Sequence, residues 1–183
     1  MKTDLSKFNN SWYDIGASKS KLLVWYFTNA LFFKNPLNPI SSVKVLLLRM
    51  FGATIGNGVV IKPSVNIKYP WKLSVGDHTW IGEEVWIDNL DVISIGSNCC
   101  LSLGALLLCG SHDHKDVAFG LKIKPIILED GVWIGAKSTV LQGVTCKSHS
   151  ILSANSVASV NMEAYSIYRG NPAVIAGLRV ISN

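Results

Sequence analysis

The sequence predicts an all-β solenoid, a parallel β-helix that follows a short N-terminal helical region. Aliphatic residues recur at every sixth position over most of the chain, and glycine follows several of them. This period fits neither an α-helix nor an alternating strand, but it fits a coil with one flat strand and one corner per repeat. Three repeats close a triangular coil of about eighteen residues, so the aliphatic positions stack into one interior. The series comprises Ile55, Ile61, Ile67, Val75, Ile81, Ile87, Ile95, Leu101, Leu107, Leu128, Ile134, Val140, Cys146, Leu152 and Ala158.

The series is interrupted at three places. The steps that follow Ile67 and Ile87 are eight residues long rather than six, which indicates corners with two extra residues. A larger break follows Leu107, where the polar segment 108–127 replaces the regular pattern. Loops that leave a solenoid usually carry function, because the coils beneath hold them rigidly. We therefore expect the chemistry of this protein in the loop 108–127.

Residues 1–52 are predicted to form the helical region. The apolar run 22–33 is about twelve residues long, whereas a membrane-spanning helix needs about twenty. We expect a helix that packs on the solenoid or on another subunit. A second helix is expected from Ser41 to Phe51, capped by Ser41 or Ser42 and ended by Gly52. Because lysines flank both stretches, shallow contact with a membrane surface is an alternative.

The composition limits the remaining organisation. With 183 residues, the chain is expected to form one domain, the β-helix 53–160, followed by a C-terminal tail at 161–183. The formal net charge of +5 favours an anionic ligand, such as the phosphates of a nucleotide cofactor, but basic residues form no cluster. We expect no nucleic-acid partner. The four cysteines lack CxxC spacing and the first residues do not resemble a secretory leader, which favours reduced thiols and a cytoplasmic location.

His112 is the candidate catalytic residue, because an imidazole with its ordinary pKa of about 6.5 accepts and releases a proton near neutral pH. Asp113 and Asp116 could orient its ring or could only solvate the loop. His114 and Cys109 raise the alternative of a zinc site, but no fourth ligand has a defined spacing. We therefore expect no metal.

Three tryptophans should point outward from the solenoid, because each precedes an inward aliphatic position. They are Trp80, Trp86 and Trp133. Large aromatic side chains are costly to leave in water, so a neighbouring subunit, a ligand or the N-terminal helices should cover them. For Trp133, which follows the loop, subunit contact or a ligand cleft is the favoured interpretation.

Three segments carry a resemblance to a known family: Gly110-Ser111-His112-Asp113, Asp130-Gly131-Val132-Trp133-Ile134-Gly135-Ala136 and Gly170-Asn171-Pro172-Ala173. Together with the hexapeptide repeats, they resemble the left-handed β-helix acetyltransferases. The nearest subgroup is that of the colanic-acid-biosynthesis-type acetyltransferases, relatives of maltose and galactoside O-acetyltransferases. The likeness extends from about residue 12 to 177. It implies a left-handed parallel β-helix; the six-residue period alone does not determine the hand.

The resemblance also implies a homotrimer, with acetyl-CoA bound in active sites between adjacent subunits. It makes His112 the general base for an acceptor sugar hydroxyl and Asn89 the residue that positions the acceptor. The main-chain N–H of Ala136 would polarise the thioester carbonyl. The implied cofactor-binding residues are Trp133, Ala136, Ala154, Ser159 and Arg179. Arg179 would bind the 3'-phosphate, with Lys137 as the alternative.

We therefore expect acetyl-CoA-dependent O-acetylation of a sugar hydroxyl in exopolysaccharide or surface-glycan biosynthesis, without a metal. Two alternatives stay open. The first is a metal-dependent hydratase of the carbonic-anhydrase type, although the spacing of the four histidines does not reproduce a three-histidine site between subunits. The second is a non-catalytic glycan-binding solenoid.

Overall fold

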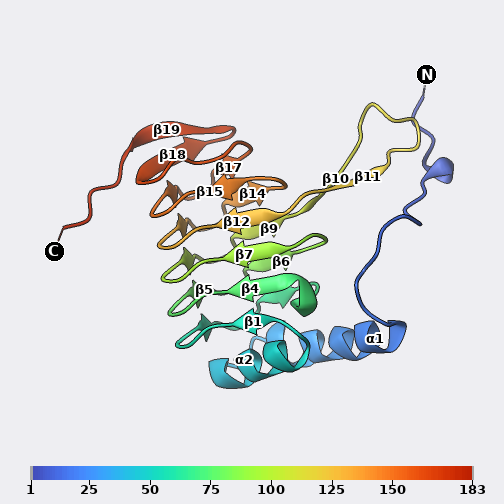
Figure 1. The fold of residues 1–183 in the computed structure, drawn as a ribbon, viewed down its shortest axis with the longest axis horizontal. Helices are drawn as coiled ribbons and strands as arrows, with labels where there is room; N and C mark the ends of the chain where they lie inside the picture. Colours follow the sequence, from blue (N-terminus) through green and yellow to red (C-terminus); the bar gives the residue numbers. More distant parts are fainter. Residues whose placement is uncertain (1, 183) are drawn as a thin grey trace.

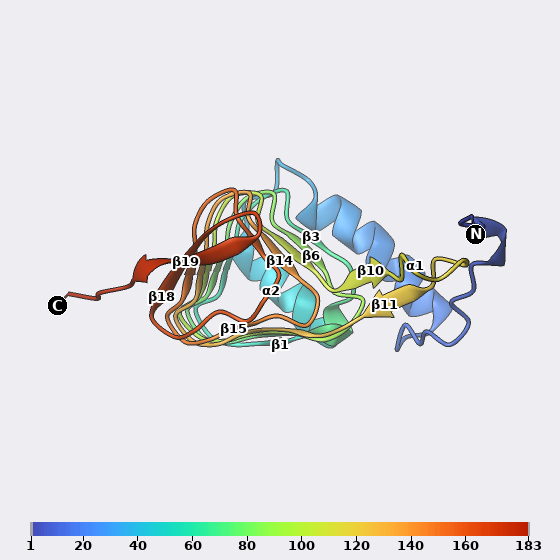
Figure 2. The same cartoon turned by 90° about the horizontal axis from the view of Figure 1, so that it is seen from above.

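The structure, a computed structural model, describes residues 2–182 and contains a parallel β-solenoid with two helices at one end (Figure 1). Seen from above, the coils superpose as a prism with three sides (Figure 2). This arrangement confirms the predicted fold class, a parallel β-helix with an N-terminal helical region. We name the edges of the prism A–B, B–C and C–A after the sheets that they join.

The three sheets are built from strands of successive coils. Sheet A contains β1 (Thr54–Ile55), β4 (Leu73–Val75), β7 (Ile93–Ile95), β12 (Ile126–Leu128) and β15 (Thr145–Cys146). Sheet B contains β2 (Val60–Ile61), β5 (Trp80–Ile81), β8 (Cys100–Leu101), β13 (Trp133–Ile134), β16 (Ile151–Leu152), β18 (Ser166–Gly170) and β19 (Ala173–Leu178). Sheet C contains β3 (Asn66–Ile67), β6 (Trp86–Asp88), β9 (Leu106–Leu108), β14 (Thr139–Leu141) and β17 (Val157–Ala158).

The interior follows the six-residue series. Every residue of that series is buried. The parallel register places aliphatic residues of successive coils next to each other, with Ile61 beside Ile81 and Ile87 beside Leu107. Burial of these aliphatic side chains supplies the main stabilising free energy of the solenoid. The residue before each inward position points outward, as predicted, and all three tryptophans of this kind are about half exposed.

The residues that interrupt the six-residue series all lie at the C–A edge of the solenoid. The short helix η3 (Pro70–Lys72) occupies the first eight-residue step, and residues 89–92 occupy the second. The loop 108–127 lies on the same edge, one coil further along the axis. The three insertions therefore build one wall along a single edge of the prism.

The N-terminal region contains η1 (Leu5–Lys7), α1 (Lys19–Thr28), a π-helical turn η2 (Asn29–Phe33) and α2 (Ser41–Met50). Trp25 anchors α1, because its Nε1 donates to the carbonyl of Ile67 at 3.0 Å. Gly52 follows α2 with a φ of +98°, which glycine adopts without steric cost. The helix therefore ends where it was predicted to end.

The predicted cap of α2 is wrong. Residue Ile40 precedes the helix and makes no side-chain capping bond, whereas Ser41 lies inside the first turn. The Ser41 hydroxyl instead accepts the N–H of Ile61 at 2.8 Å, so it joins the helix to the first coil. Ser18 provides the cap of α1, because its hydroxyl accepts the N–H of Lys21.

The segment 161–183, expected as a tail, contributes two strands to sheet B. Strand β18 pairs in parallel with β16 and antiparallel with β19, and so closes the end of the solenoid opposite the helices. Within residues 2–182, no helix is long and apolar enough to cross a membrane.

Candidate active site at the C–A edge

The polar loop forms a β-hairpin that projects from the prism (Figures 1 and 2). Strand β10 (Gly110–His112) pairs antiparallel with β11 (Leu121–Ile123), and His112 lies opposite Leu121. The carboxylate of Asp116 accepts the N–H groups of Ala118 and Gly120, which closes the turn at the tip. The hairpin is thus an ordered element that holds His112 away from the solenoid wall.

The imidazole of His112 is fixed by Phe119. Its Nδ1 lies 2.9 Å from the carbonyl oxygen of Phe119, and the two rings stack with centroids 4.5 Å apart. Because a carbonyl oxygen can only accept, Nδ1 carries the hydrogen of this bond. In the neutral imidazole, Nε2 then has the free lone pair and can act as a base. The Phe119 contact is a feature that sequence reasoning missed, since no local pattern links the two residues.

Neither acidic residue near His112 is bonded to its ring. Asp113 pairs with Lys122 at 2.8 Å across the hairpin, and this hydrogen bond holds the pKa of the Asp113 carboxyl below its usual value. Asp113 and Asp116 thus take neither of the two roles considered for them: each carboxylate bonds to other groups of the loop and braces it. Cys109 is buried at the base of the hairpin, and burial raises the pKa of its thiol to about 12. Within residues 2–182, no three His, Cys, Asp or Glu side chains are grouped as a metal site requires.

The N-terminal arm, residues 2–8, reaches the same hairpin. The N–H of Asp4 donates to the carbonyl of Val117 at 2.8 Å, and the ring of Phe8 lies 5.8 Å from that of His112. Leu5 and Phe8 line a shallow hollow of about 360 Å³ together with His112 and Phe119. His112 is therefore flanked by aromatic rings from two segments that are far apart in the sequence.

A larger cavity of about 380 Å³ lies between α1 and the outer face of sheet C. Trp86 and Tyr26 provide aromatic walls, and Lys68 pairs with Asp88 at 2.8 Å along its lining. The carbonyl of Asp88 accepts the N–H of Cys109, the first residue of the corner from which the hairpin leaves. The cavity is therefore adjacent to the base of the hairpin that carries His112.

Asn89, the residue expected to position the acceptor, lies inside the C–A corner. Asn89 is fully buried, its Oδ1 accepts the N–H of Tyr69 at 2.9 Å, and its Nδ2 donates to the carbonyl of Tyr69 at 2.6 Å. Both ends of the amide are occupied by the corner of the coil below. Asn89 therefore holds the C–A edge together in the single chain.

Ala136 and Ala154 lie on a different edge of the prism, B–C, in turns of adjacent coils. Within residues 2–182, the N–H of Ala136 donates to no protein acceptor. Gly135 allows the coils to close here, because a Cβ at this position would lie 2.5 Å from the nitrogen of Ala154. The edge therefore presents main-chain donors beside small side chains, which permits close approach of a ligand.

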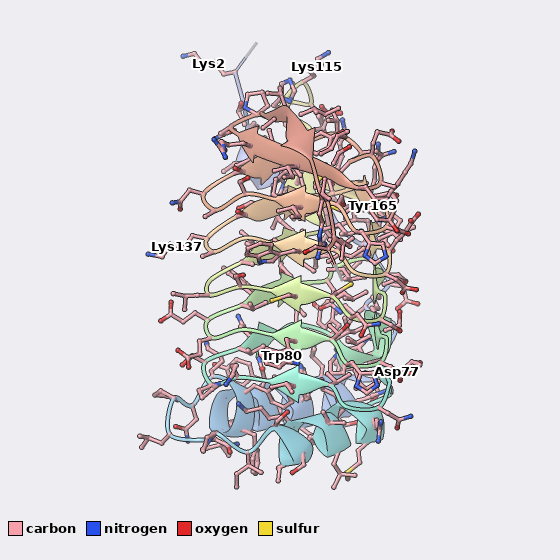
Figure 3. The ribbon with its side chains drawn as sticks, turned by 90° about the vertical axis from the view of Figure 1, so that its left-hand side faces the viewer. Lys2, Asp77, Trp80, Lys115, Lys137 and Tyr165 are labelled. Atoms are coloured by element: carbon pink, nitrogen blue, oxygen red, sulfur yellow. The ribbon has the colours of Figure 1, made fainter. Side chains whose placement is uncertain are left out.

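Lys137 and Arg179 occupy opposite sides of sheet B. Figure 3 shows Lys137 extending from one side of this face and Tyr165 on the other. Arg179 lies on the Tyr165 side, where its Nη1 donates to the carbonyls of Gly131 and His149. Arg179 therefore lies away from the edge of Ala136, whereas its alternative Lys137 lies on that edge.

Trp133 lies on the outer face of sheet B, between Cys100 and Ile151, and its Nε1 donates to the Ser102 hydroxyl at 2.9 Å. Sheet B faces away from the C–A edge, so Trp133 and His112 lie on opposite sides of one prism. Ser159 is on the C–A edge, two turns beyond the hairpin. The sequence-predicted residues thus do not meet within one chain.

Comparisons with known proteins identify the family. A repeat family described as the hexapeptide repeat of succinyl-transferase matches residues 125–158. The colanic acid biosynthesis acetyltransferase WcaF of Escherichia coli K12 is 36% identical over 177 residues, which cover 97% of each chain. The chain belongs to the hexapeptide-repeat acetyltransferase family. It is therefore an acyltransferase.

Solved structures of hexapeptide-repeat acetyltransferases agree with this assignment. A hexapeptide-repeat-containing acetyltransferase of Vibrio cholerae superposes with a TM-score of 0.78 at 25% identity, covering 90% of this chain and 96% of its own. A galactoside acetyltransferase solved with coenzyme A has a TM-score of 0.76 at 21% identity, covering 87% of this chain and 80% of its own, and shows the fold alone. The fold is therefore the one on which known acetyltransferases are built.

Proposed function

We propose that this hexapeptide-repeat acetyltransferase transfers the acetyl group of acetyl-CoA to a hydroxyl group of a saccharide, in exopolysaccharide or surface-glycan biosynthesis. The observation that carries the proposal is the state of His112, whose Nδ1 is bonded to a carbonyl and whose Nε2 is free to act as a base. The 36% identity to a colanic acid biosynthesis acetyltransferase supports both the donor and the glycan context.

The proposed reaction is a direct attack on the thioester. Nε2 of His112 removes the proton from the acceptor hydroxyl as its oxygen bonds to the acetyl carbonyl carbon. The negative charge passes to the carbonyl oxygen, where the free N–H of Ala136 would stabilise it. Collapse of this intermediate breaks the carbon–sulfur bond, and the protonated His112 returns the proton to the CoA sulfur. Acetyl ester and CoA are the products, and the enzyme is unchanged.

Two chains are needed to complete this site. His112 lies on the C–A edge, whereas Ala136 and Trp133 lie on the B–C edge and on sheet B. We place each active site between the hairpin of one protomer and the B–C edge of its neighbour in a homotrimer. The exposed apolar side chains of Trp80 and Trp133 would be covered by this contact, which agrees with the cost of leaving them in water. Lys137 would bind the 3'-phosphate of CoA.

The cavity between α1 and sheet C would hold the acceptor. Trp86 offers an aromatic face to the apolar face of a sugar ring, and the Lys68–Asp88 pair offers donors and acceptors to its hydroxyls. Its position beneath the hairpin would direct one hydroxyl towards His112 of the same chain. We also place the enzyme in the cytoplasm.

The test measures CoA release from acetyl-CoA with a panel of free, nucleotide-linked and lipid-linked saccharides. With an accepted sugar, His112→Ala should lower kcat by at least about a hundredfold, because it removes the general base. His114→Ala is the matched control, since His114 is an exposed histidine of the same loop. Near-normal turnover of His112→Ala would rule out the proposed base, and binding of glycan without any acetyl transfer would favour a glycan-binding solenoid instead.

A further inference from the structure

The segment formed by α1 and η2 carries large apolar side chains on two opposite faces. Trp25 and Asn29 lie on the face that packs against the solenoid. The opposite face carries Leu23, Phe27 and Leu31, whose exposed fractions are 59%, 54% and 62%. A helix that is apolar on all sides is typically covered on all sides. The outer face of α1 therefore lacks its cover in the single chain.

Helix α2 repeats this arrangement at the same end of the solenoid. Lys44 and Leu48 are buried against the first coil, and Leu46 and Met50 face away from it. Figure 1 shows α1 and α2 together at this end, beyond β1. We call seven of the exposed apolar side chains at this end the basal patch: Leu23, Phe27, Leu31, Leu37, Ile40, Leu46 and Met50.

The charge around the basal patch has one sign. Between Asp14 and Asp77 the sequence contains no aspartate or glutamate, whereas it contains eight basic residues. These residues are Lys19, Lys21, Lys34, Lys44, Arg49, Lys62, Lys68 and Lys72. Lys44 is buried and Lys68 pairs with Asp88, so neither belongs to the rim. Lys19 and Lys34 are exposed and lie at the two ends of the α1–η2 segment. An apolar surface with a basic rim is complementary to an anionic lipid surface.

We propose that the basal patch docks on an anionic membrane, with α1 and α2 lying in the plane of the interface. The apolar side chains would enter the boundary between headgroups and acyl chains, and the lysines would contact lipid phosphates. A second copy of this chain is a poorer occupant, because two identical basic rims would repel each other. In a homotrimer with parallel prism axes, all three basal patches would face the same way, so one membrane could bind them together.

Docking would also place the acceptor cavity beside the membrane. Leu22, Tyr26 and Ala30 line that cavity from the flank of α1 next to the basal patch. A saccharide carried on a membrane lipid could then enter the cavity from the bilayer surface. This consequence rests on the proposed acetyl transfer, whereas the docking itself does not.

The experiment measures co-sedimentation with vesicles of phosphatidylcholine alone and of phosphatidylcholine mixed with phosphatidylglycerol. We expect binding to the anionic vesicles at least about tenfold tighter than to the neutral ones, and weaker binding as salt is raised. The double variant Phe27→Ser, Leu31→Ser should lower binding by about tenfold or more, and Lys19→Gln should lower it several-fold. Val160→Ser is the control, because Val160 is exposed but lies in the last coils of the solenoid, away from the helices.

Equal binding to both vesicle types, or unchanged binding of the double variant, would overturn the proposal. A fall in the oligomeric mass of the double variant, measured by light scattering, would also overturn it, since another copy would then be the cover. Acetyl transfer to a soluble saccharide should be unchanged in the double variant. If docking fails while acetyl transfer is normal, only the docking proposal is wrong. If docking is normal but no acetyl transfer occurs, only the proposed function is wrong.

Discussion

The ring of Phe119 lies against the ring of His112 with their planes 10° apart, and the carbonyl of Phe119 fixes Nδ1 of the same imidazole. Phe119 adopts a φ of +54°, an unusual conformation for a bulky residue. The turn of the hairpin thus holds this backbone in place, and one residue restrains both the tilt and the tautomer of the candidate base.

Replacement of Phe119 by asparagine tests this restraint. Asparagine tolerates a positive φ, so Phe119→Asn should keep the carbonyl in place and remove only the stacked ring. We expect kcat to fall by about tenfold or more through loss of ring orientation, with an unchanged KM for acetyl-CoA. Steady-state kinetics check this prediction, and an unchanged kcat would show that stacking does not orient the base.

Phe8→Ala should loosen the hairpin. Phe8 packs on His112, and Asp4 of the same arm bonds to Val117. Amide hydrogen exchange in residues 110–123 should become faster by several-fold, because the arm stabilises the closed hairpin. Leu37→Ala is the matched control, since Leu37 is a highly exposed apolar residue at the helical end. Equal exchange rates in both variants would contradict a role of the arm.

Asn89→Ala should lower stability rather than acceptor affinity. The substitution leaves the buried N–H of Tyr69 without a partner, which costs about 1–3 kcal/mol. The carbonyl of Tyr69 loses one of its two bonds and keeps the N–H of Lys72. We expect a lower free energy of unfolding in urea and an unchanged KM for the acceptor. A raised acceptor KM at unchanged stability would restore the positioning role to Asn89.

The four cysteines should differ in their reactivity. Burial raises the pKa of Cys99 to about 11 and that of Cys109 and Cys146 to about 12, so these thiols stay protonated at neutral pH. Cys100 is partly exposed on sheet B. Iodoacetamide should therefore modify Cys100 first in the folded protein and all four in urea, as mass spectrometry can follow. Early labelling of Cys109 would show that the base of the hairpin opens.

Stability should decrease at alkaline pH. The folded pKa of Cys146 lies above the ordinary value of 9.0, so this thiol stabilises the fold below about pH 9. As pH rises from about 9 towards 12, the unfolded chain loses its thiol proton first, and unfolding becomes easier by up to about 1.4 kcal/mol per pH unit. Urea unfolding between pH 8 and about 10.5 should show a smaller decline for Cys146→Ala. Equal slopes would contradict the raised pKa.

The sequence alone determined the solenoid, because a six-residue period is a local pattern that each coil repeats. It also determined which aliphatic residues are buried, which tryptophans face outward, and that the break after Leu107 carries His112. These features depend on spacing along the chain, and burial of apolar surface converts the spacing into structure.

Only the tertiary structure decided how the site is held. Asn89 pairs with Tyr69 twenty residues away, and Arg179 is bonded to carbonyls of Gly131 and His149. Phe8 contacts His112, which lies 104 residues further along the chain. Such partners are fixed by the stacking of coils and by the return of the N-terminal arm, which no local pattern encodes. The stacking of three-sided coils also decides that His112 and Ala136 lie on different edges of the prism.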